Sequence, residues 1–276
     1  MSICQPSLEN STSAWIVGID LAWGDKRKDG LCLFHATRDG ATFIKATTTK
    51  GDAELLAWLQ QNILLSDCAL LVIDAPLIVP NATGSRPVDK QITLDFGKYH
   101  AGCYPANSTK CARPLRVAQL LRNNGYVLGH DLKTASRMAA EVYPHPAMIR
   151  LFHLDRIIKY KKGAVAAKKL EFKKLQNHSR QFLHNRSDIS VSESVDVLLN
   201  TDWSKTVEDQ TDAVVCALIG YLHWKHQGHL SKIIGSIEEG FILLPPRFRN
   251  GVPLMFEGRT GQAVTMEMVN RLRDEE

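Results

Sequence analysis

Two aspartates of this chain stand at the ends of apolar runs, in positions where a metal ion could hold them. Asp20 follows the run that begins at Ala14, and Asp74 follows a second run that begins at Ala69. Uninterrupted apolar runs are typical of strands buried on both faces of a sheet. A carboxylate there needs a capping contact, a lysine or a metal ion. If the two strands are neighbours, the paired carboxylates are either protonated or held by a divalent cation.

A second acidic pair, Asp209 and Asp212, precedes a nearly all-apolar segment that ends at Leu222. This segment predicts a buried helix that begins near Glu208. A spacing of three residues places both aspartates on one face of that helix. Their alternative role is capping, because acids in the first turn suit the helix dipole. Capping explains one aspartate better than it explains two.

A long connection follows Asp74, and it contains Arg86 and Asp89. Arg86 could bind a phosphate through two parallel hydrogen bonds, or it could pair internally with Asp89. Glu141 lies in another expected strand, from Met138 to Tyr143, which should neighbour the strand of Asp74. Glu141 is either a further catalytic carboxylate or the partner of a buried lysine or arginine.

Basic residues concentrate between positions 156 and 174 and predict a helix with its apolar side chains on the opposite face. They are Arg156, Lys159, Lys161, Lys162, Lys168, Lys169, Lys173 and Lys174. Such a face is either solvated or in contact with phosphates. In the second case Lys161 or Lys162 could reach a phosphate.

The elements that must position these residues begin with three antiparallel strands, at about 14–21, 31–35 and 42–48. Gly18 leaves room for close backbone approach inside the first strand. Asp52 is expected to cap a helix over 53–63, which returns the chain to a strand over 69–74. A strand reached through a helical crossover is usually parallel to an earlier strand.

We expect a single domain over residues 14–246, with a loose tail at 1–13 and a C-terminal extension at 247–276. Residues 78–113 are too long for an ordinary loop and indicate an insertion or a functional segment. A basic helical segment is expected at about 156–185. Neither an internal repeat nor a low-complexity tract is evident.

Composition narrows the class of protein only moderately. The chain has 276 residues, 44% of them hydrophobic and 23% charged, and a net charge of +5. These values are typical of a globular protein, and the mild positive charge permits nucleic-acid binding without requiring it. Without a secretory signal or a run that could span a bilayer, we expect no membrane association and a cytoplasmic location. The oligomeric state stays open.

Zinc binding has little support, because none of the six cysteines forms a Cys-x-x-Cys pair. His100, Cys103 and Cys111 could ligate zinc, but their spacing is irregular and a fourth ligand is missing.

The placement of acids at strand ends and on a late helix resembles the ribonuclease H-like fold. More closely, the chain resembles the domain of unknown function 429 family, which is described as predicted nucleases of that fold. The resemblance spans most of 16–245. The matching motifs are Gly-Ile-Asp-Leu-Ala-Trp (18–23), Ile-Asp-Ala-Pro-Leu (73–77), Arg-Pro-Val-Asp (86–89), Glu-Val-Tyr-Pro (141–144), Tyr-Lys (160–161) and Asp-Gln-Thr-Asp-Ala (209–213).

The resemblance implies an α/β fold with a ribonuclease H-like mixed sheet flanked by helices. It also implies a nuclease that hydrolyses phosphodiester bonds of DNA or RNA with two Mg²⁺ (or Mn²⁺) ions. The metal ligands would be Asp20, Asp74, Asp209 and Asp212, with Glu141 a weaker catalytic candidate. One alternative is a non-catalytic nucleic-acid-binding protein. Another is an ATP-using phosphotransferase of the related actin-like fold, although no glycine-rich phosphate loop follows the first strand.

Overall fold

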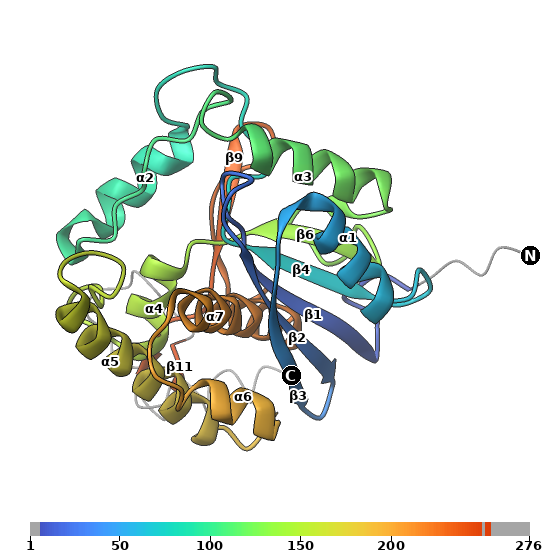
Figure 1. The fold of residues 1–276 in the computed structure, drawn as a ribbon. Helices are drawn as coiled ribbons and strands as arrows, with labels where there is room; N and C mark the ends of the chain where they lie inside the picture. The colour runs from blue at the N-terminus through green and yellow to red at the C-terminus, as the bar shows by residue number, and fades with distance from the viewer. Residues whose placement is uncertain (1–5, 250–251, 255–276) are drawn as a thin grey trace, which may run out of the picture.

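A seven-stranded mixed sheet forms the centre of the computed structural model, which describes residues 6–249 and 252–254 (Figure 1). The strand order is β5-β6-β4-β1-β2-β3-β7. The strands are β1 (Ser13–Asp20), β2 (Asp29–Thr37), β3 (Ala41–Thr49), β4 (Ala69–Ile73), β5 (Val127–Leu128), β6 (Arg137–Glu141) and β7 (Ile189–Val191).

The sheet has the mixed topology expected from the sequence. β1, β2 and β3 form an antiparallel meander. β4 pairs with β1 in parallel, and β6 pairs with β4 in parallel. Every residue of β4 is buried, which agrees with the uninterrupted apolar run in the sequence. The arrangement is consistent with a ribonuclease H-like fold.

Helices cover both faces of the sheet (Figure 1). α1 (Gly51–Asn62) and α3 (Ala112–Asn123) share one apolar core with one face of the sheet. α7 (Lys205–Lys225) packs on the other face, in a second core that also includes residues of α4 (Pro144–Phe152), α5 (Val165–His184) and α6 (Glu193–Leu198). No described helix is long and apolar enough to cross a membrane.

The contact between α7 and β1 depends on a glycine in the strand. A Cβ atom at Gly18 would lie 2.0 Å from the Ala213 carbonyl oxygen and 2.3 Å from the Ala217 nitrogen. No larger residue could occupy this position without moving the helix. The backbone of α7 therefore crosses directly over β1, as the glycine in the apolar run suggested.

Two helices begin at different residues than expected. Lys50, and not Asp52, is the N-cap of α1, and Asp52 instead pairs with Arg113 and Arg116. α7 begins at Lys205, and the Ser204 side chain caps it by accepting from the Val207 nitrogen. Asp209 and Asp212 thus lie beyond the first turn, so capping does not explain them.

The segment 78–113 contains ordered structure that the sequence did not predict. It includes α2 (Pro87–Phe96) and a 3₁₀ turn, η1 (Gly97–Tyr99). α2 packs against a two-stranded sheet formed by β8 (Lys232–Ser236) and β9 (Gly240–Leu244). The insertion is thereby attached to the body of the protein.

The chain ends differ in part from the expected boundaries. Leu8 is fully buried, and its carbonyl oxygen accepts from Trp224 Nε1 at 3.0 Å, so the expected loose tail is packed from about residue 6. In the expected C-terminal extension, β10 (Phe248–Arg249) pairs with β11 (Val252–Pro253). Residues 1–5, 250–251 and 255–276 lie outside the described residues. In the basic segment, the helix starts only at Val165.

Candidate active site

Asp20 and Asp74 stand side by side at one edge of the sheet. Ile19 of β1 is opposite Ile73 of β4, and the Asp74 nitrogen donates to the Ile19 carbonyl oxygen at 2.8 Å. Each aspartate is the next residue along its strand. Both strands run in the same direction, so both carboxylates emerge at the carboxyl-terminal edge, where ligands collect in open α/β sheets.

The close approach of α7 brings Asp209 and Asp212 over the same edge. A Cβ atom at Gly30 of β2 would lie 1.9 Å from the Asp209 carbonyl oxygen, so the helix start rests directly on the strand that pairs with Asp20. Asp212 is fully buried and Asp209 nearly so. Two strands, and a helix that follows them by more than a hundred residues, thus bring four carboxylates to the same edge of the sheet.

Lys161 supplies a positive charge inside this group. Its Nζ lies 2.9 Å from Asp212 Oδ2, while the Tyr160 hydroxyl donates to Asp212 Oδ1 at 2.6 Å. Burial by itself lowers the pKa of Lys161, but Asp212, Tyr160, Asp20 and Asp74 together raise it well above its ordinary value. Lys161 therefore carries an ammonium charge at neutral pH and is the counterion of the acids.

One ammonium group does not neutralise these carboxylates. Burial, followed by the charges of neighbouring acids, raises the pKa of Asp20 well above its ordinary value and that of Asp74 to about 7, although Lys161 opposes both shifts. Within the described part of the chain, neither carboxylate accepts a hydrogen bond. Asp212 Oδ2 also has no well-aligned donor, in spite of its ion-pair distance to Lys161. The four carboxylates therefore carry more negative charge than Lys161 neutralises, and they offer oxygens that can accept further contacts.

Asp209 differs from the other three because it has its own partner. Lys205 Nζ lies 2.7 Å from Asp209 Oδ1 and 2.7 Å from Glu208 Oε1. Burial still raises the pKa of Asp209 in spite of this lysine. Lys205 was not predicted as a site residue, although its position four residues before Asp209 on a helix would have indicated the pair.

Glu141 and Arg86 form a buried ion pair beside Asp74, and both line the small cavity that contains Asp74. Arg86 NH2 lies 2.6 Å from Glu141 Oε1 and NH1 lies 2.8 Å from Oε2, while Asp89 accepts from Nε and NH2. Arg86 NH1 also donates to the Ile78 carbonyl oxygen. All five N–H groups of Arg86 are used, so none is left for a phosphate. Both alternatives raised from the sequence, the Arg86–Asp89 pair and an arginine partner for Glu141, are present.

The side-chain alternation along the strands places Glu141 and Asp74 toward different faces of the sheet. Glu141 is opposite Ile73, and Ile73 faces the core of α1 and α3. Asp74 is one residue further along and therefore points to the face of α7. Glu141 accepts instead from the Leu77 nitrogen at 3.0 Å, which holds the turn after Asp74. Glu141 thus holds the turn that follows Asp74 through Leu77 and Arg86.

The carboxylates offer the oxygen donors that Mg²⁺ and Mn²⁺ prefer. Asp20, Asp74 and Asp212 fit such an ion by their chemistry, and Lys161 is the counterion that the ion would replace at Asp212. Among residues 6–249 and 252–254, however, no three Asp, Glu, His or Cys side chains are already placed to hold one ion. As the chain stands, Lys161 provides the positive charge in this site.

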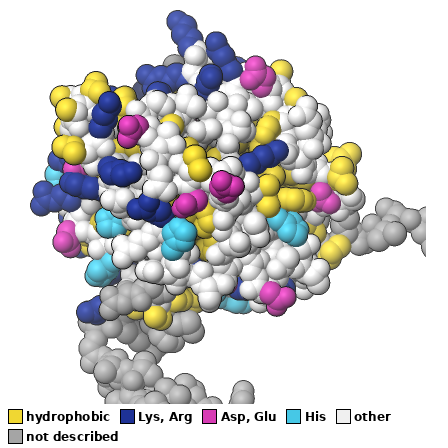
Figure 2. Space-filling model, turned by 60° about the horizontal axis from the view of Figure 1, so that its bottom comes forward, with side chains coloured by type: hydrophobic (Ala, Val, Ile, Leu, Met, Phe, Trp, Pro, Cys, Tyr) yellow, Lys and Arg dark blue, Asp and Glu magenta, His cyan; other side chains and the backbone are white. Residues whose placement is uncertain are grey.

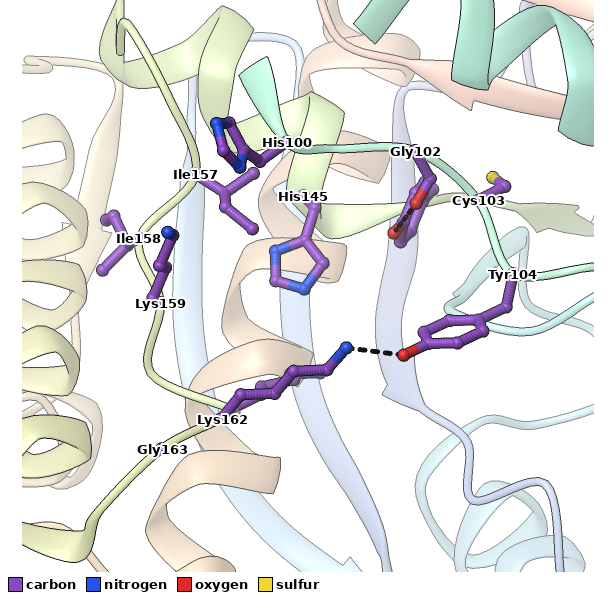
Figure 3. A pocket seen from close by; sticks show the side chains of 12 residues that line it. His100, Gly102, Cys103, Tyr104, His145, Ile157, Ile158, Lys159, Lys162 and Gly163 are labelled. Atoms are coloured by element: carbon purple, nitrogen blue, oxygen red, sulfur yellow. Dashed lines mark hydrogen bonds between the residues drawn. The ribbon is translucent and has the colours of Figure 1, made fainter. Parts of the chain in front are cut away.

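Two large cavities meet at Lys161. The first, of about 650 Å³, is lined by Lys161, Lys162, Tyr104 and His145 among others (Figure 3). Lys162 Nζ lies 2.6 Å from the Tyr104 hydroxyl, at the rim and not among the carboxylates. The second cavity, of about 530 Å³, contains Asp209. Its other polar lining residues include Arg27, Lys28, Lys168 and Lys205.

Several residues around these cavities were not predicted from the sequence. Tyr104 and His145 belong to segments without a clear periodicity, so no pattern pointed to them. His100 and Cys103, considered for zinc, line the first cavity, whereas Cys111 lies in a separate apolar cluster with Val79. The three considered zinc ligands are therefore not brought together.

Fold and site together define the class: an α/β protein with a mixed sheet. Acids from two parallel strands and from a crossing helix meet at one edge of that sheet. The family described as "Protein of unknown function (DUF429)" matches residues 18–239, so the chain belongs to this family. No curated protein and no solved structure matches the chain.

Proposed function

We propose that this protein is a metal-dependent nuclease that hydrolyses phosphodiester bonds of DNA or RNA. The observation that carries the proposal is the convergence of Asp20, Asp74 and Asp212 on the carboxyl-terminal edge of the sheet, with more negative charge than Lys161 neutralises. A site with raised carboxylate pKa values beside open cavities is typical of a catalytic centre. We also propose a cytoplasmic location, because the five cysteines in the described part of the chain are free thiols.

In this proposal Asp20, Asp74 and Asp212 would hold Mg²⁺ or Mn²⁺, with Asp209 at the edge of the site. When bound, such ions lower the pKa of an attacking water and neutralise the charge on the leaving oxygen. The Tyr160 hydroxyl keeps Asp212 in place by donating to its Oδ1. Lys161, which is the counterion of the acids in the metal-free chain, would then be available to contact a phosphate oxygen.

The basic cavity supports a polyanionic substrate. Arg27, Lys28, Lys168 and Lys205 surround the second cavity next to Asp209, and Figure 2 shows Lys and Arg side chains gathered along the top and left of one face. The segment that carries Arg27 and Lys28 is fixed at its ends. Arg113 bonds both oxygens of Asp29 at 2.7 Å and also the Ala22 carbonyl oxygen. Clustered cations of this kind attract the phosphates of a nucleic acid.

The test is cleavage of single-stranded, duplex, hybrid and branched DNA and RNA with Mg²⁺ or Mn²⁺. The parent protein is compared with Asp74→Asn and with Asp95→Asn, whose aspartate lies in α2 and pairs with Lys232. We expect metal-dependent cleavage by the parent and by Asp95→Asn, and a loss of at least about a hundredfold in Asp74→Asn.

Two other outcomes would replace this proposal. If no substrate is cut and Asp74→Asn binds nucleic acid as the parent does, the protein is a nucleic-acid-binding protein without catalysis. If ATP raises the melting temperature of the parent and no nucleic acid binds, the ATP-using phosphotransferase is the better description.

A further inference from the structure

The first cavity has the size and walls of a binding pocket that the nuclease chemistry does not use. Its volume of about 650 Å³ lies within the range of small-molecule sites. One wall is the segment 100–104, the floor is the start of α4, and the opposite wall is the segment 157–163 (Figure 3). The Ile157 nitrogen donates to the Tyr99 carbonyl oxygen at 2.9 Å, which ties the two walls together.

His145 lines this pocket, and one of its ring nitrogens is buried without a partner among the described residues. Its ring lies in the middle of the view in Figure 3, between the two walls, and its Nδ1 is buried without a hydrogen-bond partner. Burial, together with the charges of Lys161 and Lys162, lowers the pKa of His145 to about 3. The imidazole is therefore neutral at pH 7 and offers one donor and one acceptor nitrogen. A ligand with a polar edge could exchange a hydrogen bond with the part of this ring that borders the cavity.

An aromatic ring stands at the rim of the same pocket. The Tyr104 side chain is 67% exposed, and its hydroxyl is held by Lys162 Nζ at 2.6 Å (Figure 3). A large exposed aromatic side chain next to a cavity is a surface on which a planar ring can stack. Single-stranded nucleic acids are commonly bound by stacking of their bases on such rings.

The pocket adjoins the carboxylates on two sides. Lys161 lines it and also contacts Asp212. Tyr104 lines both this pocket and a small cavity of about 70 Å³ that contains Asp74. A planar group on Tyr104 would thus lie next to a phosphate bound at the carboxylates.

We propose that this pocket holds one unpaired nucleobase, stacked on Tyr104 and hydrogen-bonded by His145, with the adjoining phosphate near Lys161. The inference deepens the proposed nuclease function and rests on it. It makes the substrate a strand with at least one unpaired nucleotide beside the cleaved bond. A base inside a duplex could enter only after being turned out of the stack.

Binding is measured by fluorescence anisotropy with the Asp74→Asn protein, so that the strand is not cut. The probes are a labelled ten-nucleotide single strand, the same strand in a duplex, a series with one abasic nucleotide at each position, and a free mononucleotide. The variants are Tyr104→Leu, Tyr104→Phe and His145→Leu, with the exposed His229→Leu as the matched histidine control. Melting temperatures check that each variant is folded.

We expect the single strand to bind at least about tenfold more tightly than the duplex. Tyr104→Leu and His145→Leu should each lose about tenfold, whereas Tyr104→Phe and His229→Leu should bind as the unaltered protein does. At one abasic position the loss from Tyr104→Leu should disappear, because the base that the ring stacks on is missing. Tyr104 is exposed, so this arm remains informative if His145→Leu does not fold.

Equal binding of the intact strand by all folded variants, or equal binding of duplex and single strand, would overturn the inference. Absence of binding to every probe would overturn it as well, while metal-dependent cleavage by the parent would still decide the nuclease function separately. If only the free mononucleotide binds, with the same dependence on Tyr104, the base pocket stands and the nuclease function fails.

Discussion

Lys161 and Asp212 form an ion pair, with 2.9 Å between Nζ and Oδ2, at the point where four carboxylates converge. Asp20 and Asp74 add their negative charge to the same place and raise the pKa of Lys161. The lysine thereby stands in for part of the positive charge that a metal ion would bring. Metal binding and this ion pair should therefore oppose one another.

Removing the lysine charge should strengthen metal binding. In Lys161→Met the acids lose their counterion, so we expect Mn²⁺ to bind about tenfold more tightly, which corresponds to about 1.4 kcal/mol. The metal-free variant should also be less stable than the parent at pH 8. Isothermal titration calorimetry and thermal denaturation measure the two effects. Lys162→Met is the matched control, because Lys162 contacts Tyr104 and pairs with no acid in the described part of the chain. Equal Mn²⁺ affinities for the two variants would show that the Lys161–Asp212 ion pair does not oppose metal binding.

Neutralising Asp74 should stabilise the metal-free protein at high pH. The pKa of Asp74 is raised from 3.8 to about 7, so between these values the native state holds a proton that the unfolded chain has lost. This contribution to stability falls as pH rises through that window. Asp74→Asn avoids the loss, and its melting temperature should exceed that of the parent by roughly a few °C at pH 8 but not at pH 4.

Mg²⁺ should reverse the order of the melting temperatures of the parent and Asp74→Asn at pH 8. Saturating metal should raise the melting temperature of the parent and leave that of Asp74→Asn nearly unchanged, because ligand binding stabilises only a competent native state. If Asp74→Asn is less stable than the parent at pH 8 without metal, the ionised Asp74 carboxylate does not destabilise the native protein.

Glu141 should matter for stability and not for metal binding. Glu141→Gln leaves Arg86 without the charge of its bidentate partner inside the protein. Because Asp89 still pairs with Arg86 in this variant, we expect a cost of about 1–3 kcal/mol, measured as the free energy of unfolding in urea. The Mn²⁺ affinity of the folded variant should stay within about twofold of the parent value. A loss of Mn²⁺ binding without a loss of stability would return Glu141 to the set of metal ligands.

Gly18 should be essential for seating α7. Gly18→Ala places a methyl group 2.0 Å from the Ala213 carbonyl oxygen, so the helix must move. We expect the free energy of unfolding to fall by more than the roughly 1–3 kcal/mol that overpacking usually costs, or the variant not to fold at all. Gly24→Ala is the control, since nothing lies within 4 Å of its added Cβ. Similar urea midpoints for the two variants would show that α7 does not press on β1.

The strands and the long buried helix were predictable because their patterns are strong. Apolar runs before Asp20 and Asp74 reflect burial on both faces, and Gly18 indicated a close backbone approach, which α7 makes. β7 has three residues and α6 has six, too few for a period to stand out. α4 was missed because Pro144 and Pro146 suggested the end of a strand, whereas proline is tolerated in the first turn of a helix.

The partner of each charged side chain away from the strand ends was the part that could not be predicted from the sequence. The order of the motifs along the chain predicted that Asp20, Asp74 and Asp212 lie near one another, because the positions of strand ends and helix starts follow from the fold. Nothing in the sequence distinguished a phosphate-binding Arg86 from one buried against Glu141. That difference arises from the alternation of side chains along β6, which depends on the exact register with β4.

The most direct test of the account is a calorimetric titration of Mn²⁺ into the parent protein, Asp20→Asn, Asp74→Asn and Asp95→Asn at pH 8. The account predicts binding by the parent and by Asp95→Asn, and at least about tenfold weaker binding by the other two variants. Equal affinities across the four proteins, or no binding by the parent at millimolar Mn²⁺, would contradict the assignment of these carboxylates to a metal site.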